Sequence, residues 1–232
     1  MMLTIYIPTY QRPDSLNQLL SVVAPQITDG VEIIVSDNDG DAAPIVARYS
    51  QVQYIKRWQN IGCDGNCLAG LSEGSGEYVW VLGDDDLPSG DAVEYILGEL
   101  GIVDRLILTA ERSGEYPAGF LGTMTDLYHQ LTDKSFLVAS TLCSMNVWRY
   151  GAMDAVLGLR HLDSRNVLAW AGLNCNTVKV ADRPTMTVNR TNLTSFTGWA
   201  STMNQYVLSL CMAIGVQPAS LRAFNKWNYT NI

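Results

Sequence analysis

The sequence predicts an α/β protein in which helices flank a mostly parallel β-sheet. Short apolar runs of strand length alternate with helical patterns over the first half of the chain, and this alternation is typical of βαβ units. The runs are apolar on both faces, as strands covered by helices are. Polar loops follow the strands, so we expect them to meet at one edge of the sheet, where open α/β sheets bind ligands.

The first strand covers Leu3–Ile7, a β-branched run that ends at Pro8. Pro13 then occupies the first turn of a helix, where its missing N–H is not needed. Apolar residues at helical spacing allow this helix to pack on the sheet; they are Leu16, Leu19, Leu20 and Val23. The same unit then recurs. Its further strands are Val31–Val35, Val52–Ile55 and Glu77–Leu82, and its further helices are Ala42–Tyr49 and the residues from Asn60 to about Ser72.

The second half is less regular, and no repeat or linker separates it from the first half. We expect a helical C-terminal extension over Ser201–Gly215. The other predicted helices are Asp91–Leu100, Leu121–Leu131, Val147–Leu162 and Val167–Ala171. The predicted strands are Arg105–Ala110, Phe136–Ala139 and Thr177–Val180.

With 232 residues, 47% of them hydrophobic and 16% charged, the chain can bury the core of a globular protein. Its formal net charge of -8 argues against nucleic-acid binding, because the phosphate backbone would repel it. The N-terminus lacks the pattern of a signal peptide, and no stretch approaches the roughly 20 apolar residues of a membrane span. We therefore expect a cytoplasmic protein without a transmembrane segment.

Five cysteines, an odd number, are scattered through the chain, which is typical of reduced thiols rather than of a disulfide framework. Cys63 and Cys67 form a C-x3-C pair, but no second pair of ligands lies near them in the sequence. The chain also contains two histidines only. A zinc site is therefore not expected.

The strongest candidate for a site is the run Asp84, Asp85 and Asp86, directly after the strand at Glu77–Leu82. Three adjacent like charges are unfavourable unless a cation compensates them. Hard divalent cations prefer carboxylate oxygen, and Mg2+ leaves part of its shell to substrate phosphates. The run therefore indicates a metal–diphosphate site, and the alternative is a solvated acidic turn before the helix that starts near Ser89. The G-x-G-x-x-G and G-x-x-x-x-G-K-[ST] motifs of dinucleotide enzymes and P-loop NTPases are absent.

Four segments stand in order along the chain: IPTYQRPDSL, EIIVSDNDGD, NIGCDGN and GEYVWVLGDDDLPSGDAV. Together they resemble the family 2 glycosyltransferases of the GT-A fold, which is Rossmann-like, and look like its branch of bacterial O-antigen abequosyltransferase-like enzymes. The resemblance implies a role in polysaccharide biosynthesis, in which a sugar passes from a nucleotide-sugar, most favourably a UDP-sugar, to a glycan or other hydroxyl acceptor. It implies Mn2+ or Mg2+ as cofactor. It also implies a nucleotide-sugar-binding half over residues 1–100, an acceptor-binding half over 101–200 and the extension over 201–232.

The same resemblance assigns roles to individual residues. The first loop would face the nucleotide with Pro8, Thr9, Tyr10 and Arg12. Asp37 would accept the N–H of a pyrimidine base and so select uracil. The ribose and diphosphate would be lined by Asn60, Gly62, Asp64 and Asn66. Asp84 and Asp86 match the outer members of the DXD motif: both would hold the metal, and Asp84 and Asp85 would also contact the nucleotide-sugar.

An inverting transfer needs a carboxylate that deprotonates the acceptor hydroxyl, while a metal stabilises the departing diphosphate. In the family this base is an Asp downstream of the DXD motif, ahead of a helix and then a strand, and Asp163 matches best. Asp154 and Asp126 stay open as alternatives, although each is as readily a helix cap or a surface charge. His161 could ligate the metal or act in acid–base chemistry, but a single His is more often structural.

Two other functions stay open. A sugar-nucleotide pyrophosphorylase would carry a G-x-G-T-R loop after the first strand, where this chain has PTYQR. A non-catalytic nucleotide-sugar-binding or glycan-binding protein would keep the fold without the chemistry, and the absence of the family's Glu-Asp pair at the base favours it. Release of nucleoside diphosphate from the donor distinguishes the enzyme from the binder.

Overall fold

The computed structural model describes residues 2–110, 116–130, 140–160, 167–173 and 175–187. Its strands are β1 (Leu3–Thr9), β2 (Val31–Asp37), β3 (Val52–Lys56), β4 (Tyr78–Val81), β5 (Leu87–Pro88), β6 (Arg105–Ile107), β7 (Leu121–Gly122), β8 (Asn146–Arg149), β9 (Val178–Val180) and β10 (Met186–Thr187). Its α-helices are α1 (Pro13–Val23), α2 (Ala43–Val46), α3 (Gly62–Glu73), α4 (Ala92–Glu99), α5 (Met124–Gln130), α7 (Ala155–Leu159) and α8 (Val167–Ala171). Three short 3-10 helices are η1 (Ala24–Gln26), η2 (Cys143–Met145) and η3 (Tyr150–Ala152).

Eight strands form one sheet in the order β3-β2-β1-β4-β8-β6-β9-β7, and β5 pairs with β10 apart from it. The pairs β1–β2, β1–β4 and β2–β3 are parallel, as predicted. In the β1–β2 register Thr9 lies opposite Asp37. The loops after β1, β2 and β4 therefore leave the sheet at the same edge, called the carboxyl edge below.

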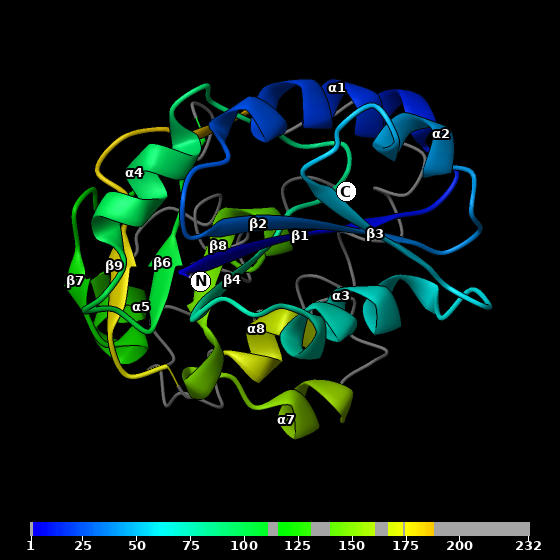
Figure 1. Ribbon diagram of the computed structural model, residues 1–232. Coiled ribbons are helices and arrows are strands. Elements are labelled where there is room, and N and C mark those ends of the chain that lie inside the picture. The colour runs from blue at the N-terminus through cyan, green and yellow to red at the C-terminus, as the bar shows by residue number, and fades with distance from the viewer. Residues whose placement is uncertain (1, 111–115, 131–139, 161–166, 174, 188–232) are drawn as a thin grey trace, which may run out of the picture.

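Helices cover both faces of the sheet (Figure 1): α1 and α2 lie on one face, and α3 and α8 lie on the other. The alternation of side chains along β1 follows from this arrangement, since Ile5 and Ile7 pack in the cluster with α1 whereas Tyr6 packs in the cluster with α3. The predicted apolar stripe of α1 is fully buried: Leu16, Leu19, Leu20 and Val23. Each such leucine stabilises the fold by about 2 kcal/mol. The core thus holds the carboxyl edge rigid.

The prediction of a helix over Val147–Leu162 is wrong for its first part. Asn146–Arg149 is strand β8, which runs antiparallel between β4 and β6. Val147 and Trp148 are both fully buried, one in each core cluster, and pairing on two sides overrides the local helical pattern. A helix forms only at Ala155–Leu159, where the Asp154 carboxylate accepts a hydrogen bond from Leu157 N at 2.9 Å.

The predicted helix over Leu121–Leu131 also begins later than expected. Leu121–Gly122 is strand β7, which pairs antiparallel with β9. Helix α5 begins at Met124, because Thr123 and Asp126 form a capping box with Thr123 Oγ1 at 2.6 Å from Asp126 Oδ2.

Several predictions fall outside the described residues: the strand Phe136–Ala139, the helix Ser201–Gly215, and the positions of His161 and Asp163. The domain division at residues 100 and 200 stays a prediction. Among the residues that the structure describes, no helix is both long enough and apolar enough to cross a membrane.

Candidate functional site

The loops after β1 and β4 meet at the carboxyl edge through four polar residues. Thr9 Oγ1 donates a hydrogen bond to Asp84 Oδ2 at 2.7 Å, and Arg12 Nη1 lies 3.1 Å from Asp84 Oδ1. Arg12 Nη1 also lies 2.9 Å from Asp85 Oδ2. Thr9, Arg12, Asp84 and Asp85, all predicted site residues, are therefore brought together in the fold although the two loops lie far apart in the sequence.

The Asp84–Asp86 loop is held from the second half of the chain. Gly83 N donates to Ser144 Oγ at 2.9 Å, and Trp80 Nε1 donates to Ser144 O at 2.9 Å. Ser144 is buried in the 3-10 helix η2, directly before the antiparallel strand β8. Sequence reasoning missed this contact, because Ser144 belongs to no motif and the antiparallel strand was not predicted.

Gly83 is closely surrounded by polar side chains, and a Cβ atom there would lie 3.2 Å from Ser144 Oγ and near two carboxylates. A Cβ atom at Gly83 would lie 3.3 Å from Asp85 Oδ1 and 3.4 Å from Asp86 Oδ2. Two carboxylate oxygens therefore approach the same point from the two residues that follow. Hard divalent cations bind this kind of oxygen donor, so the residues present fit a Mg2+ or Mn2+ ion.

Burial and charge act in opposite directions on Asp84, which is only 4% exposed. Burial raises the pKa of Asp84 above its ordinary value, although the hydrogen bond from Thr9 and the charge of Arg12 act to lower it. Burial alone would lower the pKa of Arg12, but the charges of Asp84 and Asp85 outweigh it and raise that pKa. The Arg12 guanidinium thus faces the negative charges of Asp84 and Asp85.

The structure gives Asp37 a task that was not predicted. Its side chain is fully buried, and its carboxylate accepts hydrogen bonds from Asp39 N at 3.1 Å, Ala42 N at 2.9 Å and Tyr54 Oη at 2.8 Å. These bonds make Asp37 a residue that shapes its own loop, and its contact with a pyrimidine base stays a prediction.

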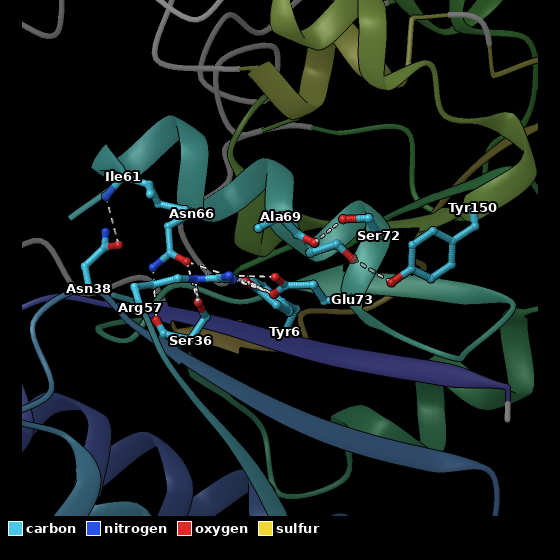
Figure 2. Close-up of polar contacts among 11 residues, drawn as sticks. Tyr6, Ser36, Asn38, Arg57, Ile61, Asn66, Ala69, Ser72, Glu73 and Tyr150 are labelled. Carbon is cyan, nitrogen blue, oxygen red and sulfur yellow. Dashed lines mark hydrogen bonds and ion pairs between the residues drawn. The ribbon is translucent and has the colours of Figure 1, made fainter. Parts of the chain in front are cut away.

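Asn66 points from α3 toward Ser36 on the sheet (Figure 2). It is 1% exposed, its Nδ2 donates to Ser36 O at 3.0 Å, and its Oδ1 accepts from Ser36 Oγ at 2.5 Å. Because Ser36 belongs to β2, these bonds fasten helix α3 to the sheet. Asn66 is therefore a scaffold residue in this structure.

An ion-paired network continues from Asn66 along the underside of α3 (Figure 2). Arg57 Nε donates to Ser36 Oγ at 2.8 Å, Arg57 Nη1 donates to Glu73 Oε1 at 2.6 Å, and Tyr6 Oη donates to Glu73 Oε2 at 2.9 Å. The planar guanidinium pairs with the carboxylate through two nitrogens, the geometry that favours Arg over Lys. Sequence reasoning missed this network, since an Arg after a strand and a Glu at a helix end carry no motif.

The segment between β3 and α3 is held by hydrogen bonds with Asn38, in the loop after β2. Asn38 Nδ2 donates to Gly62 O at 3.3 Å, and its Oδ1 accepts from Ile61 N at 3.3 Å. Asn60 Oδ1 accepts from Gly62 N at 2.8 Å, and Gly62 has a φ of 77°, which favours glycine. Asn60 and Gly62 thus form a built turn at the start of α3, beside Asp64 in its first turn. Tyr10, which follows Thr9, is 44% exposed and offers an aromatic surface at the same edge.

A second acidic group lies at this edge in the loop after β2. Carboxylate oxygens of Asp37, Asp39 and Asp41 lie within 4.8 Å of one another. Hydrogen bonds within the loop account for this approach, since Asp39 N donates to Asp37 and Asp41 N donates to Asp39. A Cβ at Gly40 would lie 3.0 Å from Lys56 Nζ, so a lysine already stands over the group. This group fits a self-contained turn better than a metal site.

The two alternative bases have structural tasks. Asp154 is the N-cap of α7 and lines a shallow pocket with Arg149 and Asp104. Arg149 pairs with Tyr78 at the start of β4, so this pocket lies at the edge opposite to Asp84–Asp86, and Asp154 is not placed to act there. Asp126 is an exposed member of a capping box.

Comparisons with known proteins agree with this geometry. In sequence, the chain is 34% identical over 102 residues to abequosyltransferase RfbV of Salmonella typhimurium, a match that spans 40% of this chain and 31% of that protein. The chain therefore covers less than a third of that relative's length.

Solved structures share the fold at low sequence identity. TarS 1-349 of S. aureus, in complex with UDP-GlcNAc, matches with a TM-score of 0.62 and 17% identity over 94% of this chain and 69% of that chain. Glucosyl-3-phosphoglycerate synthase of Mycobacterium tuberculosis, in complex with Mn2+, UDP and glucosyl-3-phosphoglycerate, matches with a TM-score of 0.58 and 13% identity over 93% and 81%. A mannosyltransferase of Pyrobaculum calidifontis, in complex with GDP-Man and Mn2+, matches with a TM-score of 0.57 and 14% identity over 91% and 63%. These likenesses show the GT-A fold.

The family model is the comparison that identifies the chain. The model described as glycosyl transferase family 2 matches residues 4–136, more than half of the sequence. The match includes both loops that meet at the carboxyl edge. This protein therefore belongs to glycosyl transferase family 2.

Proposed function

We propose that this protein transfers a sugar from a nucleotide-sugar donor, most favourably a UDP-sugar, to a hydroxyl group of a glycan or similar acceptor. The observation that carries the proposal is that Thr9 and Arg12 meet Asp84 and Asp85 at the carboxyl edge of a family 2 chain. The family 2 match supports glycosyl transfer, and the bound molecules named for the fold neighbours support a nucleoside diphosphate sugar as donor. UDP is named more often than GDP among these neighbours, which favours UDP.

In this proposal Asp84 and Asp86 hold Mn2+ or Mg2+, and Asp85 lies beside them toward the nucleotide. When bound, a divalent cation would neutralise charge on the leaving diphosphate. Thr9 fixes the orientation of the Asp84 carboxylate, and Gly83, which has no side chain, lets Asp85 and Asp86 lie close to the backbone. The exposed ring of Tyr10 and the turn at Asn60–Gly62 line the rest of the edge, where Pro8 and Asp64 also lie.

Asp163 remains our proposal for the base of an inverting transfer. It falls outside the described residues, and it precedes helix α8, as the base of this family precedes a helix. The acceptor, the cytoplasmic location and the role in polysaccharide biosynthesis are likewise parts of the proposal.

Mn2+ binding, followed by electron paramagnetic resonance, tests the metal site without requiring activity. Asp86→Ala should weaken Mn2+ binding by at least about 100-fold, since loss of a mere supporting partner of a ligand already costs up to that much. Asp39→Ala, an exposed aspartate in the other acidic loop, is the matched control and should bind like the wild type. The reverse result would move the metal to the loop after β2 and overturn the assignment.

A panel of UDP-, GDP-, CDP- and dTDP-sugars tests the chemistry. Release of UDP from a UDP-sugar, abolished in Asp86→Ala, is the expected result. Tight Mn2+-dependent binding of UDP-sugars without any release, with or without acceptors, would show a binding protein instead of an enzyme.

A further inference from the structure

We propose that Arg12 is a counter-cation that competes with a divalent cation for Asp84, and that pairs with the diphosphate of the donor once it has left Asp84 and Asp85. This inference rests on the proposed function and deepens it. It gives Arg12 opposite effects on the affinity for metal and on the affinity for nucleotide. Arg12 would weaken the binding of metal alone and strengthen the binding of the nucleotide.

The two contacts of Arg12 use a single nitrogen. Nη1 lies 3.1 Å from Asp84 Oδ1 and 2.9 Å from Asp85 Oδ2, so its two N–H groups serve two carboxylates. A guanidinium carries five N–H groups, and among the described residues the structure shows no hydrogen-bond acceptor for Nε or Nη2. Three donors in a fixed planar arrangement are therefore still available, and this arrangement suits phosphate oxygens.

The carboxylate is fixed, whereas the arginine can move. The Asp84 side chain is 6% exposed and is held by Thr9, but the Arg12 side chain is 45% exposed. An ion pair that involves so exposed a partner contributes only about 1 kcal/mol or less. A doubly charged cation can displace it at small cost, and Asp84 would keep its orientation through Thr9.

The backbone before Arg12 supports a built arrangement rather than a chance contact. Gln11 has a φ of 56°, and it alone among the described non-glycine residues has a positive φ. This conformation costs about 1–2 kcal/mol in a residue other than glycine. It occurs where the chain leaves β1 and turns into α1, and it directs Arg12 back across the edge toward β4.

The test measures two affinities in wild type, Arg12→Gln and Arg48→Gln. Arg48 is an exposed arginine on the surface beside α2, so its variant controls for the change in net charge. Without nucleotide, Arg12→Gln should bind Mn2+ about 2- to 5-fold more tightly than wild type, because the competing ion pair is gone. With saturating Mn2+, the same variant should bind UDP about tenfold more weakly, because a hydrogen bond to a charged group is lost. Arg48→Gln should change neither affinity.

The outcomes separate the inference from the proposed function. Suppose that Asp86→Ala weakens Mn2+ binding but Arg12→Gln binds Mn2+ no more tightly than the wild type. This result would overturn the inference about Arg12 and would still support the metal site. A wild type that binds no Mn2+ would overturn both. If Arg12→Gln does not fold, Arg12→Ala replaces it: this variant also removes the guanidinium and should change both affinities in the same directions.

Discussion

Two acidic loops stand at the same edge of the sheet, and they differ in what their carboxylates do. Asp37, after β2, is fully buried and accepts three hydrogen bonds from its own loop and from β3. Asp84, after β4, is also buried, but its partners are a hydroxyl and a half-exposed arginine from another loop. The pKa of Asp37 is lowered, since its hydrogen bonds together outweigh the effect of burial, whereas burial raises the pKa of Asp84.

The opposite shifts in pKa suggest a way to distinguish an aspartate that stabilises the fold from one that binds a ligand. A carboxylate that is better solvated by the protein than by water stabilises the fold. A charged carboxylate that is less stable in the protein than in water destabilises the fold, and such groups are common at sites that bind ligands. The following predictions test this contrast, and the largest effect comes first.

Removal of the Asp37 carboxylate should unfold the loop after β2. Asp37→Ala leaves Asp39 N, Ala42 N and the Tyr54 hydroxyl without their acceptor, so the free energy of unfolding should fall by about 2–4 kcal/mol. Urea unfolding measures this change, and Asp39→Ala, at an exposed position, should stay within about 0.5 kcal/mol of wild type. A stable Asp37→Ala that loses affinity for UDP but not for GDP would instead support Asp37 as the reader of the base.

The same carboxylate predicts a dependence of stability on pH. Because the pKa of Asp37 is lowered in the folded state, its contribution is present above the unfolded value of about 3.9 and is lost as pH falls through the folded value. The difference in unfolding free energy between wild type and Asp37→Asn should therefore shrink as the pH is lowered below about 4. A difference that stays constant down to the acid transition would show that the charge of Asp37 contributes nothing.

Asp84 should behave in the opposite way. Asp84→Asn replaces a buried charge by a neutral group of the same shape, and stability at neutral pH should rise by up to about 1 kcal/mol, while Mn2+ binding is lost. Thermal unfolding in the presence of a chelator measures the first effect. A clear loss of stability in Asp84→Asn would place Asp84 with Asp37 among the structural aspartates.

The smallest effect is on a thiol near Arg12. The hydrogen bond with Cys67 is the largest influence that lowers the pKa of the exposed Cys63, and the charge of Arg12 acts in the same direction. Burial raises the pKa of Cys175 to about 11. Labelling with a thiol reagent should therefore be faster at Cys63 than at Cys175, and comparison with Cys63→Ser identifies the labelling that belongs to Cys63. Arg12→Gln should slow the labelling of Cys63 by about twofold or less. Equal rates in wild type and Cys63→Ser would remove Cys63 as a reporter of Arg12.

The sequence predicted the parallel half of the fold well, because local patterns determine it. The strand runs and the stripe of α1 needed only hydrophobic periodicity and the position of Pro13. Strand β8 was missed, since Val147 and Trp148 are strand residues only through pairing with β4 and β6 on either side. Such pairing depends on residues that are distant in the sequence.

The candidate site was predicted to a similar extent. Thr9, Arg12 and Asp84 came together as expected because motif order and parallel topology determine where loops meet. The structural bonds of Asp37 and Asn66 were not predicted, since sequence cannot show which partners already occupy a polar side chain. Ser144 and Arg57 carried no pattern at all.

The antiparallel strand also bears on how the protein must be made. Until β8 is present, β4 has an open edge, and its N–H and C=O groups can pair with another chain and lead to aggregation. The family match ends at residue 136, whereas β8 begins at Asn146. A fragment cut at the end of the match would therefore lose both the cover of β4 and the Ser144 support of Gly83. During synthesis the same segment closes the sheet late, so the Asp84–Asp86 loop gains its Ser144 support only after more than half of the chain has left the ribosome.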